Sequence, residues 1–275
     1  MRRCHTETFN LGGATMKSKT LIAAALAALV AAPGIAGAAD NQIQEIRDRG
    51  VLQACHAEAF PWAVKDPASN EWKGSDVEAA KNLAAAMDVE IEHVDATWGT
   101  LIPSLEAGKC DIVMAPMFRT PERAMRILFS EPSGHETKSV TVGPNADIAD
   151  LAALDQEGKV IVVTSGSADE GFAKRFFKKA EVKSLVTDKL STLLVDVASG
   201  RADAMVSDTA SARKLVAEND NLDVRILQTD EPLDPQGYSY GIRRGEYHFL
   251  RLVNIWQEAA EQQGLKAEWS AMFSE

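Results

Sequence analysis

The sequence predicts an α/β protein with mostly parallel sheets, because short apolar runs typical of strands alternate with longer amphipathic patterns typical of helices. A second observation is that the pattern restarts near residue 159. Each half contains a helix, a glycine, a basic residue, an aspartate two positions further on, and then a strand, at Gly108–Asp111 and Gly200–Asp203. We therefore expect each half to form its own small sheet wrapped by helices.

The elements follow from the local patterns. Apolar runs predict the strands, apolar residues at helical spacing predict the helices, and Gly108 and Gly200 end the helices before them. The predicted strands are 51–55, 90–94, 111–115, 159–163, 204–207 and 238–242. The predicted helices are 76–87, 101–107, 168–177, 190–199 and 247–263, of which the last could return to complete the first half.

The segment 115–124 reads as a strand end, a turn and a helix start. Thr120 can cap the helix, and Pro121 suits the first helical position because its missing N–H would be unpaired there. Arg123 then lies at the positive end of the helix, where a guanidinium group can hold a carboxylate through two parallel hydrogen bonds. The alternative is an ordinary surface arginine in a helix start.

Residues 1–38 are predicted to be an upstream extension and a cleaved signal peptide. Lys17 and Lys19 precede an apolar run at 21–32 that is too short to span a bilayer, and 36–38 is a small-residue cleavage site. The mature chain is expected to start at Ala39, outside the cytoplasm. Because the positive region directly follows Met16, Met16 is the alternative initiator to Met1.

The mature chain of 237 residues is long enough for two lobes. It keeps 25 basic and 39 acidic residues, a net charge of −14, which argues against nucleic acids and anionic membranes as partners. Cys55 and Cys110 are expected to be free thiols, because parallel neighbouring strands would hold them far apart. The five histidines are scattered without metal-site spacing, so no metal or other cofactor is expected.

The mature sequence resembles the extracytoplasmic solute-binding proteins of the polar amino acid family, which are type II periplasmic binding proteins that serve ABC importers. The matching motifs occur in the family's order, at 50–52, 74–78, 98–105, 108–111, 120–124, 129–132, 158–159, 165–167, 200–204 and 208. The resemblance implies two lobes, each a mostly parallel sheet flanked by helices, with a hinged ligand cleft between them. Lobe 1 would hold residues 39–137 and 235–275, and lobe 2 residues 138–234.

The resemblance also implies a binding site for an amino acid. The ligand carboxylate would be held by Arg123 and by backbone N–H groups at the helix start of Ser167 and Ala168, and the ammonium by Asp208. Four further residues are expected to line the cleft: Phe118, Trp98, His56 and Phe60. Asp208 and Ser167 could instead serve only as helix caps, and Trp98 could belong to the core.

Departures from the family pattern bear on the ligand. Phe118 replaces the usual Ser or Thr hydroxyl, Ala59 stands where an aromatic residue is common, and His56 stands at a position that is often acidic in binders of basic amino acids. These changes make lysine-like or arginine-like ligands less expected. They favour an apolar or aromatic side chain, or a related small organic acid.

The implied function is the periplasmic substrate-binding component of an ABC importer, which works as a monomer with a membrane permease as its partner. A second class on the same fold is cyclohexadienyl dehydratase, which eliminates water and carbon dioxide from prephenate or arogenate and needs a general acid. His56 and Glu58 are the nearby candidates for that acid. A third class is a ligand sensor that acts on a membrane receptor, although no signalling module is fused to the sequence.

Overall fold

A computed structural model describes residues 41–144, 148–187 and 189–273. The predicted leader, its cleavage site and the start at Ala39 lie outside these residues. The helices are α1 (Gln42–Arg49), α2 (Ser75–Ala86), α3 (Leu101–Glu106), α4 (Pro121–Ala124), α5 (Leu151–Leu154), α6 (Ala168–Phe176), α7 (Leu190–Ala198), α8 (Thr209–Glu218), α9 (Tyr247–Gln262) and α10 (Leu265–Met272). The strands are β1 (Val51–His56), β2 (Val64–Lys65), β3 (Trp72–Lys73), β4 (Glu90–Asp95), β5 (Ile112–Phe118), β6 (Leu128–Phe129), β7 (Gly134–Val142), β8 (Val160–Thr164), β9 (Glu181–Leu185), β10 (Ala204–Asp208), β11 (Arg225–Ile226) and β12 (Leu233–Ile242).

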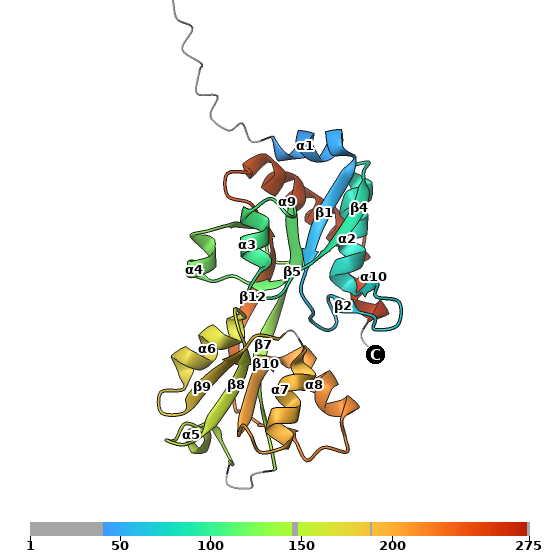
Figure 1. Cartoon of the computed structure of the whole chain (residues 1–275). Helices are drawn as coiled ribbons and strands as arrows, with labels where there is room; N and C mark the ends of the chain where they lie inside the picture. Colours follow the sequence, from blue (N-terminus) through green and yellow to red (C-terminus); the bar gives the residue numbers. More distant parts are fainter. Residues whose placement is uncertain (1–40, 145–147, 188, 274–275) are drawn as a thin grey trace, which may run out of the picture. The chain divides into compact units, whose positions relative to one another are not determined.

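Two long strands, β7 and β12, join two sets of parallel strands into one ten-stranded sheet (Figure 1). The strand order is β4-β1-β5-β12-β7-β10-β8-β9, with the outer strands parallel on both sides. The end of β12 pairs with β5 in the first lobe, and its beginning pairs antiparallel with β7. The second half of β7 pairs with β10 in the second lobe. The fold is therefore a two-lobed α/β structure in which two crossover strands belong to both halves.

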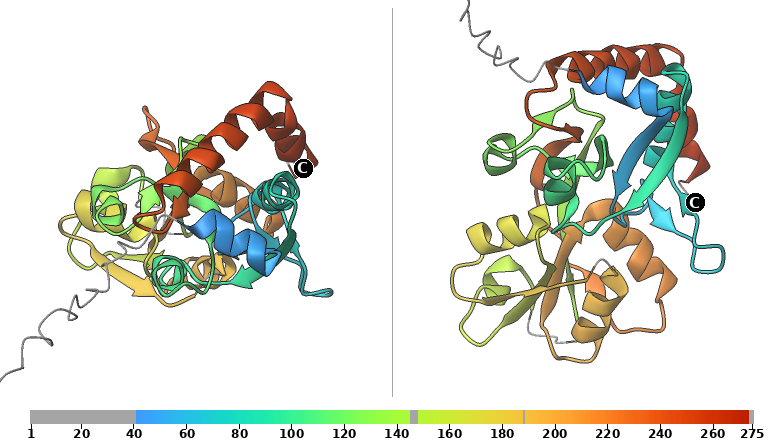
Figure 2. Two further views of the ribbon diagram at one scale, coloured as in Figure 1. Left: turned by 90° about the horizontal axis from the view of Figure 1, so that it is seen from above. Right: turned by 45° about the horizontal axis from the view of Figure 1, so that its top comes forward.

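The first lobe buries both faces of its sheet. Leu52, Ala54 and Met114 pack on one side with α2, α9 and α10, whereas Cys55 and Val113 face α3 on the other. This alternation follows from the period of two in a strand. Figure 2 shows α9 and α10 in red beside α1 and α2. The C-terminal helices therefore complete the first lobe.

The second lobe repeats this arrangement. Ile161 and Val163 of β8 face α6, and Val162 between them faces α7. Strands covered by helices on both faces are apolar along their whole length, which explains the continuous run in β8. The predicted lobe boundaries, 137/138 and 234/235, fall inside β7 and β12, and they stay a prediction.

The elements that the apolar patterns predict are present in the structure, with ends shifted by a few residues. Strand β7 is the most important element that the patterns miss. Its first half reads Gly-His-Glu-Thr-Lys, which lacks an apolar run because this half lies at a polar pocket and not in a core. None of the helices in the described part of the chain is long and apolar enough to cross a membrane.

The expectation of two free thiols is wrong, because Cys55 and Cys110 form a disulfide with their Cα atoms 5.7 Å apart. Cys110 does not lie in a strand but in the segment that returns from α3 to β5. Both side chains belong to the cluster between α3 and the sheet. The bridge therefore joins a strand to the segment above its face, and the spacing along parallel strands does not apply.

We expect the disulfide to stabilise the first lobe, because it closes a loop of 55 residues in the unfolded chain. The chain-entropy relation gives about 4 kcal/mol for a loop of this size. The double variant Cys55→Ala/Cys110→Ala should lose about 3–4 kcal/mol of unfolding free energy in urea denaturation. A reductant should lower the stability of the wild type and leave the double variant unchanged, and an equal response of both proteins would contradict this role.

Candidate functional site

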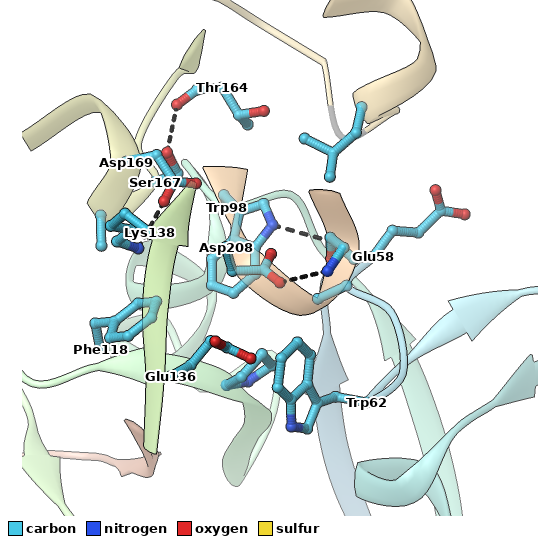
Figure 3. A pocket seen from close by; sticks show the side chains of 15 residues that line it. Glu58, Trp62, Trp98, Phe118, Glu136, Lys138, Thr164, Ser167, Asp169 and Asp208 are labelled. Carbon is cyan, nitrogen blue, oxygen red and sulfur yellow. Dashed lines mark hydrogen bonds and ion pairs between the residues drawn. The ribbon is translucent and has the colours of Figure 1, made fainter. Parts of the chain in front are cut away.

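A pocket lies where the carboxyl ends of the parallel strands of both lobes meet the crossover strand β7, the usual position for ligands in open α/β sheets (Figure 3). Both lobes and β7 contribute to its wall. The lining residues are Glu58, Ala59, Trp62, Trp98, Pro116, Phe118, Glu136, Lys138, Thr164, Ser167, Ala168, Asp169, Leu190, Asp208 and Ser211.

The N-terminus of α6 faces this pocket. Ser167 caps the helix: its Oγ accepts a hydrogen bond from the backbone N–H of Glu170 at 3.2 Å and donates one to the Thr164 carbonyl at 2.8 Å. The next residue, Ala168, begins the helix at the pocket wall. The first N–H groups of a helix have no partner within the helix, and the helix dipole favours negative charge at this end. This end of the pocket is therefore suited to an anion.

Asp208 lies at the end of β10, in the pocket and at the N-cap of α8. Its Oδ1 accepts a hydrogen bond from the Ser211 N–H at 2.8 Å. Burial, with a smaller contribution from the negative charge of Asp169, raises the pKa of Asp208 to about 7. The structure shows that Asp208 is a helix cap and also places its carboxyl group in the pocket wall, and its ligand-binding role stays a prediction.

Lys138 places a buried cation in the same pocket. Its side chain is 1% exposed, and its Nζ donates a hydrogen bond to Asp169 Oδ1 at 2.6 Å. The ammonium also lies 3.5 Å from the centre of the Phe118 ring, which attracts cations through its π-system. The sequence analysis does not predict Lys138, Asp169 or Glu136 as site residues. For Lys138 and Glu136 the available signal is the polar segment that directly follows the 129–132 motif, because this segment forms β7.

Two tryptophans form the aromatic part of the wall. The Trp98 Nε1–H donates to the Glu58 carbonyl at 3.2 Å, and the Trp62 Nε1–H donates to the Tyr238 hydroxyl at 2.9 Å. The first hydrogen bond joins two segments of the first lobe, and the second joins the loop of Trp62 to β12. They hold the indole rings in fixed positions at the pocket.

Arg123 follows the predicted local geometry but lies at an outer, more open pocket. Thr120 caps the four-residue helix α4, and its Oγ1 accepts from the Arg123 N–H at 3.3 Å. The guanidinium donates to the carbonyls of Phe118 and Gly166, each at 3.1 Å, and burial lowers its pKa. The outer pocket shares Trp98, Ser167 and Ala168 with the inner one. The structure therefore places Arg123 beside the inner pocket and not in its wall.

The family of this two-lobed protein follows from its sequence. Residues 51–264 match the family described as "Bacterial extracellular solute-binding proteins, family 3". The chain belongs to this family.

Individual relatives of this solute-binding protein include a cyclohexadienyl dehydratase of Pseudomonas aeruginosa, 28% identical over 83% of this chain and 84% of the relative. The ABC transporter arginine-binding protein 1 of Escherichia coli is 30% identical over 64% of this chain and 69% of its own. Among solved structures, the ancestral amino acid-binding protein AncCDT-1, a precursor of cyclohexadienyl dehydratase, has a TM-score of 0.75 and 30% identity over 85% of this chain and 99% of its own. A mutant of ArgBP from T. maritima has a TM-score of 0.75 and 28% identity, and the match covers 84% of this chain and 98% of its own.

The structure brings together five of the eight predicted site residues of this solute-binding protein in the wall of the inner pocket: Trp98, Phe118, Ser167, Ala168 and Asp208. Arg123 lies in the adjacent outer pocket. Phe60 lies in a different pocket, with Lys214 Nζ 4.4 Å from its ring centre. No group of three or more His, Cys, Asp or Glu side chains suited to a metal ion is found in residues 41–144, 148–187 and 189–273.

His56 is not at the pocket. Its side chain is 0% exposed, with Nδ1 2.7 Å from the Met114 carbonyl and Nε2 2.9 Å from His93 Nδ1. Burial, with the nearby His93, lowers the pKa of His56 to about 3. The strand alternation explains the position, because residue 56 still belongs to β1 and its side chain is turned into the first lobe. His56 is a core residue that is neutral at ordinary pH.

The raised pKa of Asp208 predicts a pH-dependent cost to stability. A carboxyl whose pKa is higher in the folded state keeps its proton on folding, so stability is highest below the unfolded pKa near 4 and falls as pH rises towards 7. Asp208→Asn keeps an oxygen for the cap and removes the charge. We expect this variant to be about 2 kcal/mol more stable than the wild type at pH 8 and equally stable at pH 4.

The measurement is urea denaturation of both proteins at pH 4, 6 and 8. Asp150→Asn is the matched control, since Asp150 is also an N-cap, of α5, but lies exposed at the surface. A stability difference between wild type and Asp208→Asn that does not change with pH would contradict the prediction.

Proposed function

We propose that this protein captures an amino acid in the inner pocket and delivers it to the membrane permease of an ABC importer. The observation that carries the proposal is the pairing of Asp208 with the N-terminus of α6 in one pocket. A carboxylate and a set of backbone N–H donors in one pocket match the two charges that all α-amino acids share. No chemical step is needed for this role.

The ligand would bind with its carboxylate towards Ser167 and Ala168 and its ammonium towards Asp208. Arg123 would turn its guanidinium from the backbone carbonyls to the carboxylate, because both pockets share the α6 N-terminus. A guanidinium group that forms two parallel bonds to a carboxylate gains both energy and geometric specificity. The side chain of the ligand would then extend along Trp98, Phe118 and Trp62.

The names of relatives support this class of ligand. Besides the arginine-binding protein of Escherichia coli, they include the glutamine-binding protein GlnH of Bacillus subtilis, a probable histidine-binding protein of Neisseria gonorrhoeae and an octopine-binding periplasmic protein of Rhizobium meliloti. These ligands share an α-carboxylate and an α-nitrogen.

Binding would draw the two lobes together. Lobe 1 would comprise 39–137 and 235–275, lobe 2 would comprise 138–234, and the crossover strands would act as the hinge. Arg123 comes from the first lobe and Asp208 from the second, so a ligand held by both bridges the cleft and favours the closed form. Export by the leader, a periplasmic location and a monomeric state complete the proposal.

The proposal predicts that Arg123→Ala weakens amino acid binding at least 100-fold, or about 3 kcal/mol, since the ligand carboxylate loses a charged partner in a partly buried site. The measurement is isothermal titration calorimetry of the chain from Ala39 with the twenty standard amino acids. Arg201→Ala is the matched control, because Arg201 is exposed in the second lobe, pairs with Asp196 and lies outside both pockets. Tight binding of an amino acid by Arg123→Ala would contradict the assigned role.

A second candidate function is a dehydratase of the cyclohexadienyl type. Two observations favour it: the relative of that name in Pseudomonas aeruginosa, and the pKa of about 7 that burial gives to Asp208. A carboxylic acid that keeps its proton near neutral pH in a pocket can protonate a leaving hydroxyl group. Asp208 joins Glu58 as a candidate acid at the pocket, and His56 is excluded because it is buried in the first lobe.

A measurement of prephenate turnover distinguishes the carrier from the dehydratase. Under the carrier proposal, incubation with prephenate yields no phenylpyruvate above the spontaneous rate, measured by liquid chromatography at pH 6 and 8. Formation of phenylpyruvate that is abolished in Asp208→Asn would establish the dehydratase instead. Turnover that persists in Asp208→Asn would exclude Asp208 as the general acid.

A further inference from the structure

We propose that Glu136 and Trp62 form a subsite for a positively charged group at the end of the ligand side chain. The ligand class would be amino acids that carry a guanidinium or ammonium group there. This inference rests on the proposed function and specifies its ligand.

Glu136 is placed at the pocket by the crossover strand. Residues 136 and 138 lie on the same face of β7, so the carboxylate of Glu136 and the ammonium of Lys138 enter one pocket. Glu136 Oε1 accepts a hydrogen bond from the backbone N–H of Thr137 at 2.7 Å. This bond orients the carboxylate and leaves its other oxygen for a ligand.

Trp62 lies at the same end of the pocket as Glu136 (Figure 3). Its ring is edge-on to Tyr238, with centroids 5.4 Å apart, and its Nε1–H is bonded to the Tyr238 hydroxyl. The loop that carries Trp62 is held against the start of α2, because the Trp62 carbonyl accepts a hydrogen bond from the Asp76 N–H at 2.9 Å. An indole that is held in place beside a carboxylate provides the two features that bind organic cations, a π-face and a counter-charge.

The charges of the pocket leave Glu136 without a cation. Three carboxylates lie in the pocket, those of Glu136, Asp169 and Asp208, against the single ammonium of Lys138, whereas the side chain of Glu58 points away from it (Figure 3). Lys138 is bonded to Asp169, and the proposed ligand ammonium would neutralise Asp208. Glu136 forms no ion pair with any residue in the described part of the chain. A ligand with a second positive charge would compensate it, whereas an apolar side chain would bury the carboxylate at a cost.

This inference reverses the expectation from sequence, which disfavoured basic ligands and favoured apolar, aromatic or acidic ones. That expectation depended on the assumption that His56 lines the pocket, at a position that is often acidic in binders of basic amino acids. In the structure His56 is buried in the first lobe, and the acidic group comes from Glu136 on a strand that the patterns do not predict.

The experiment compares arginine with citrulline, which has the same length but a neutral urea group in place of the guanidinium. Calorimetry of the wild type, Glu136→Gln and Glu157→Gln would use both ligands together with lysine and phenylalanine. Glu157 is the matched control because it is exposed on the surface of the second lobe. Thermal melting of each variant checks that it is folded.

We expect the wild type to bind arginine or lysine at least 30-fold more tightly than citrulline and phenylalanine. Glu136→Gln should weaken binding of the cationic ligand at least tenfold and change citrulline affinity less than threefold, while Glu157→Gln changes neither. Equal or tighter binding of citrulline or phenylalanine by the wild type would overturn the inference and leave the carrier function standing. So would an unchanged affinity of folded Glu136→Gln for arginine and lysine.

The proposed function itself fails in a different way. In that case none of the twenty amino acids binds to the folded wild type, and the inference falls with it.

Discussion

The antiparallel pairing of β7 with β12 is the constraint on which the pocket depends. β12 pairs with β5 of the first half, β7 pairs with β10 of the second half, and the two strands pair with each other. They bring polar side chains to the point where the parallel strands of both lobes end. β7 carries Glu136 and Lys138, and β12 carries Tyr238, which holds Trp62. A change in the register of this pair by one residue would turn Glu136 and Lys138 to the opposite face.

The charges in the pocket are not arranged for stability. Lys138 and Asp169 form a buried pair, which a protein can often replace with apolar residues without loss. Asp208 carries a further cost, because burial opposes its ionisation and Asp169 adds to that effect. The Phe118 ring and the caps of α6 and α8 offset part of this cost. Groups that destabilise the free protein but match the charges of a ligand are typical of a site maintained for binding.

The fold was more predictable from the sequence than the site. Strands such as β8 and β10 are covered on both faces, so each contains a continuous apolar run, at 160–163 and 204–206. Single residues such as Gly108 mark helix ends. Asp208, Ser167 and Trp98 were also predictable, because family motifs mark them. The remaining site residues depend on tertiary structure. Glu136 and Lys138 lie in a strand that has no apolar pattern, and the positions of His56 and Cys110 depend on which face of the sheet each side chain meets.

Contacts on both sides of the pocket join the two lobes. On one side the Arg123 guanidinium reaches the Gly166 carbonyl, and Gly166 lies so close to Gly99 that any side chain there would collide with that backbone. On the other side Ser211 Oγ donates to the Phe60 carbonyl at 3.1 Å, and Lys214 lies over the Phe60 ring. Most of these contacts use backbone carbonyls or ring faces and carry no information about the ligand. Under the proposed function, closure would be available to any ligand, and selectivity would come from the charged groups inside the pocket, each of which loses its water when the lobes meet.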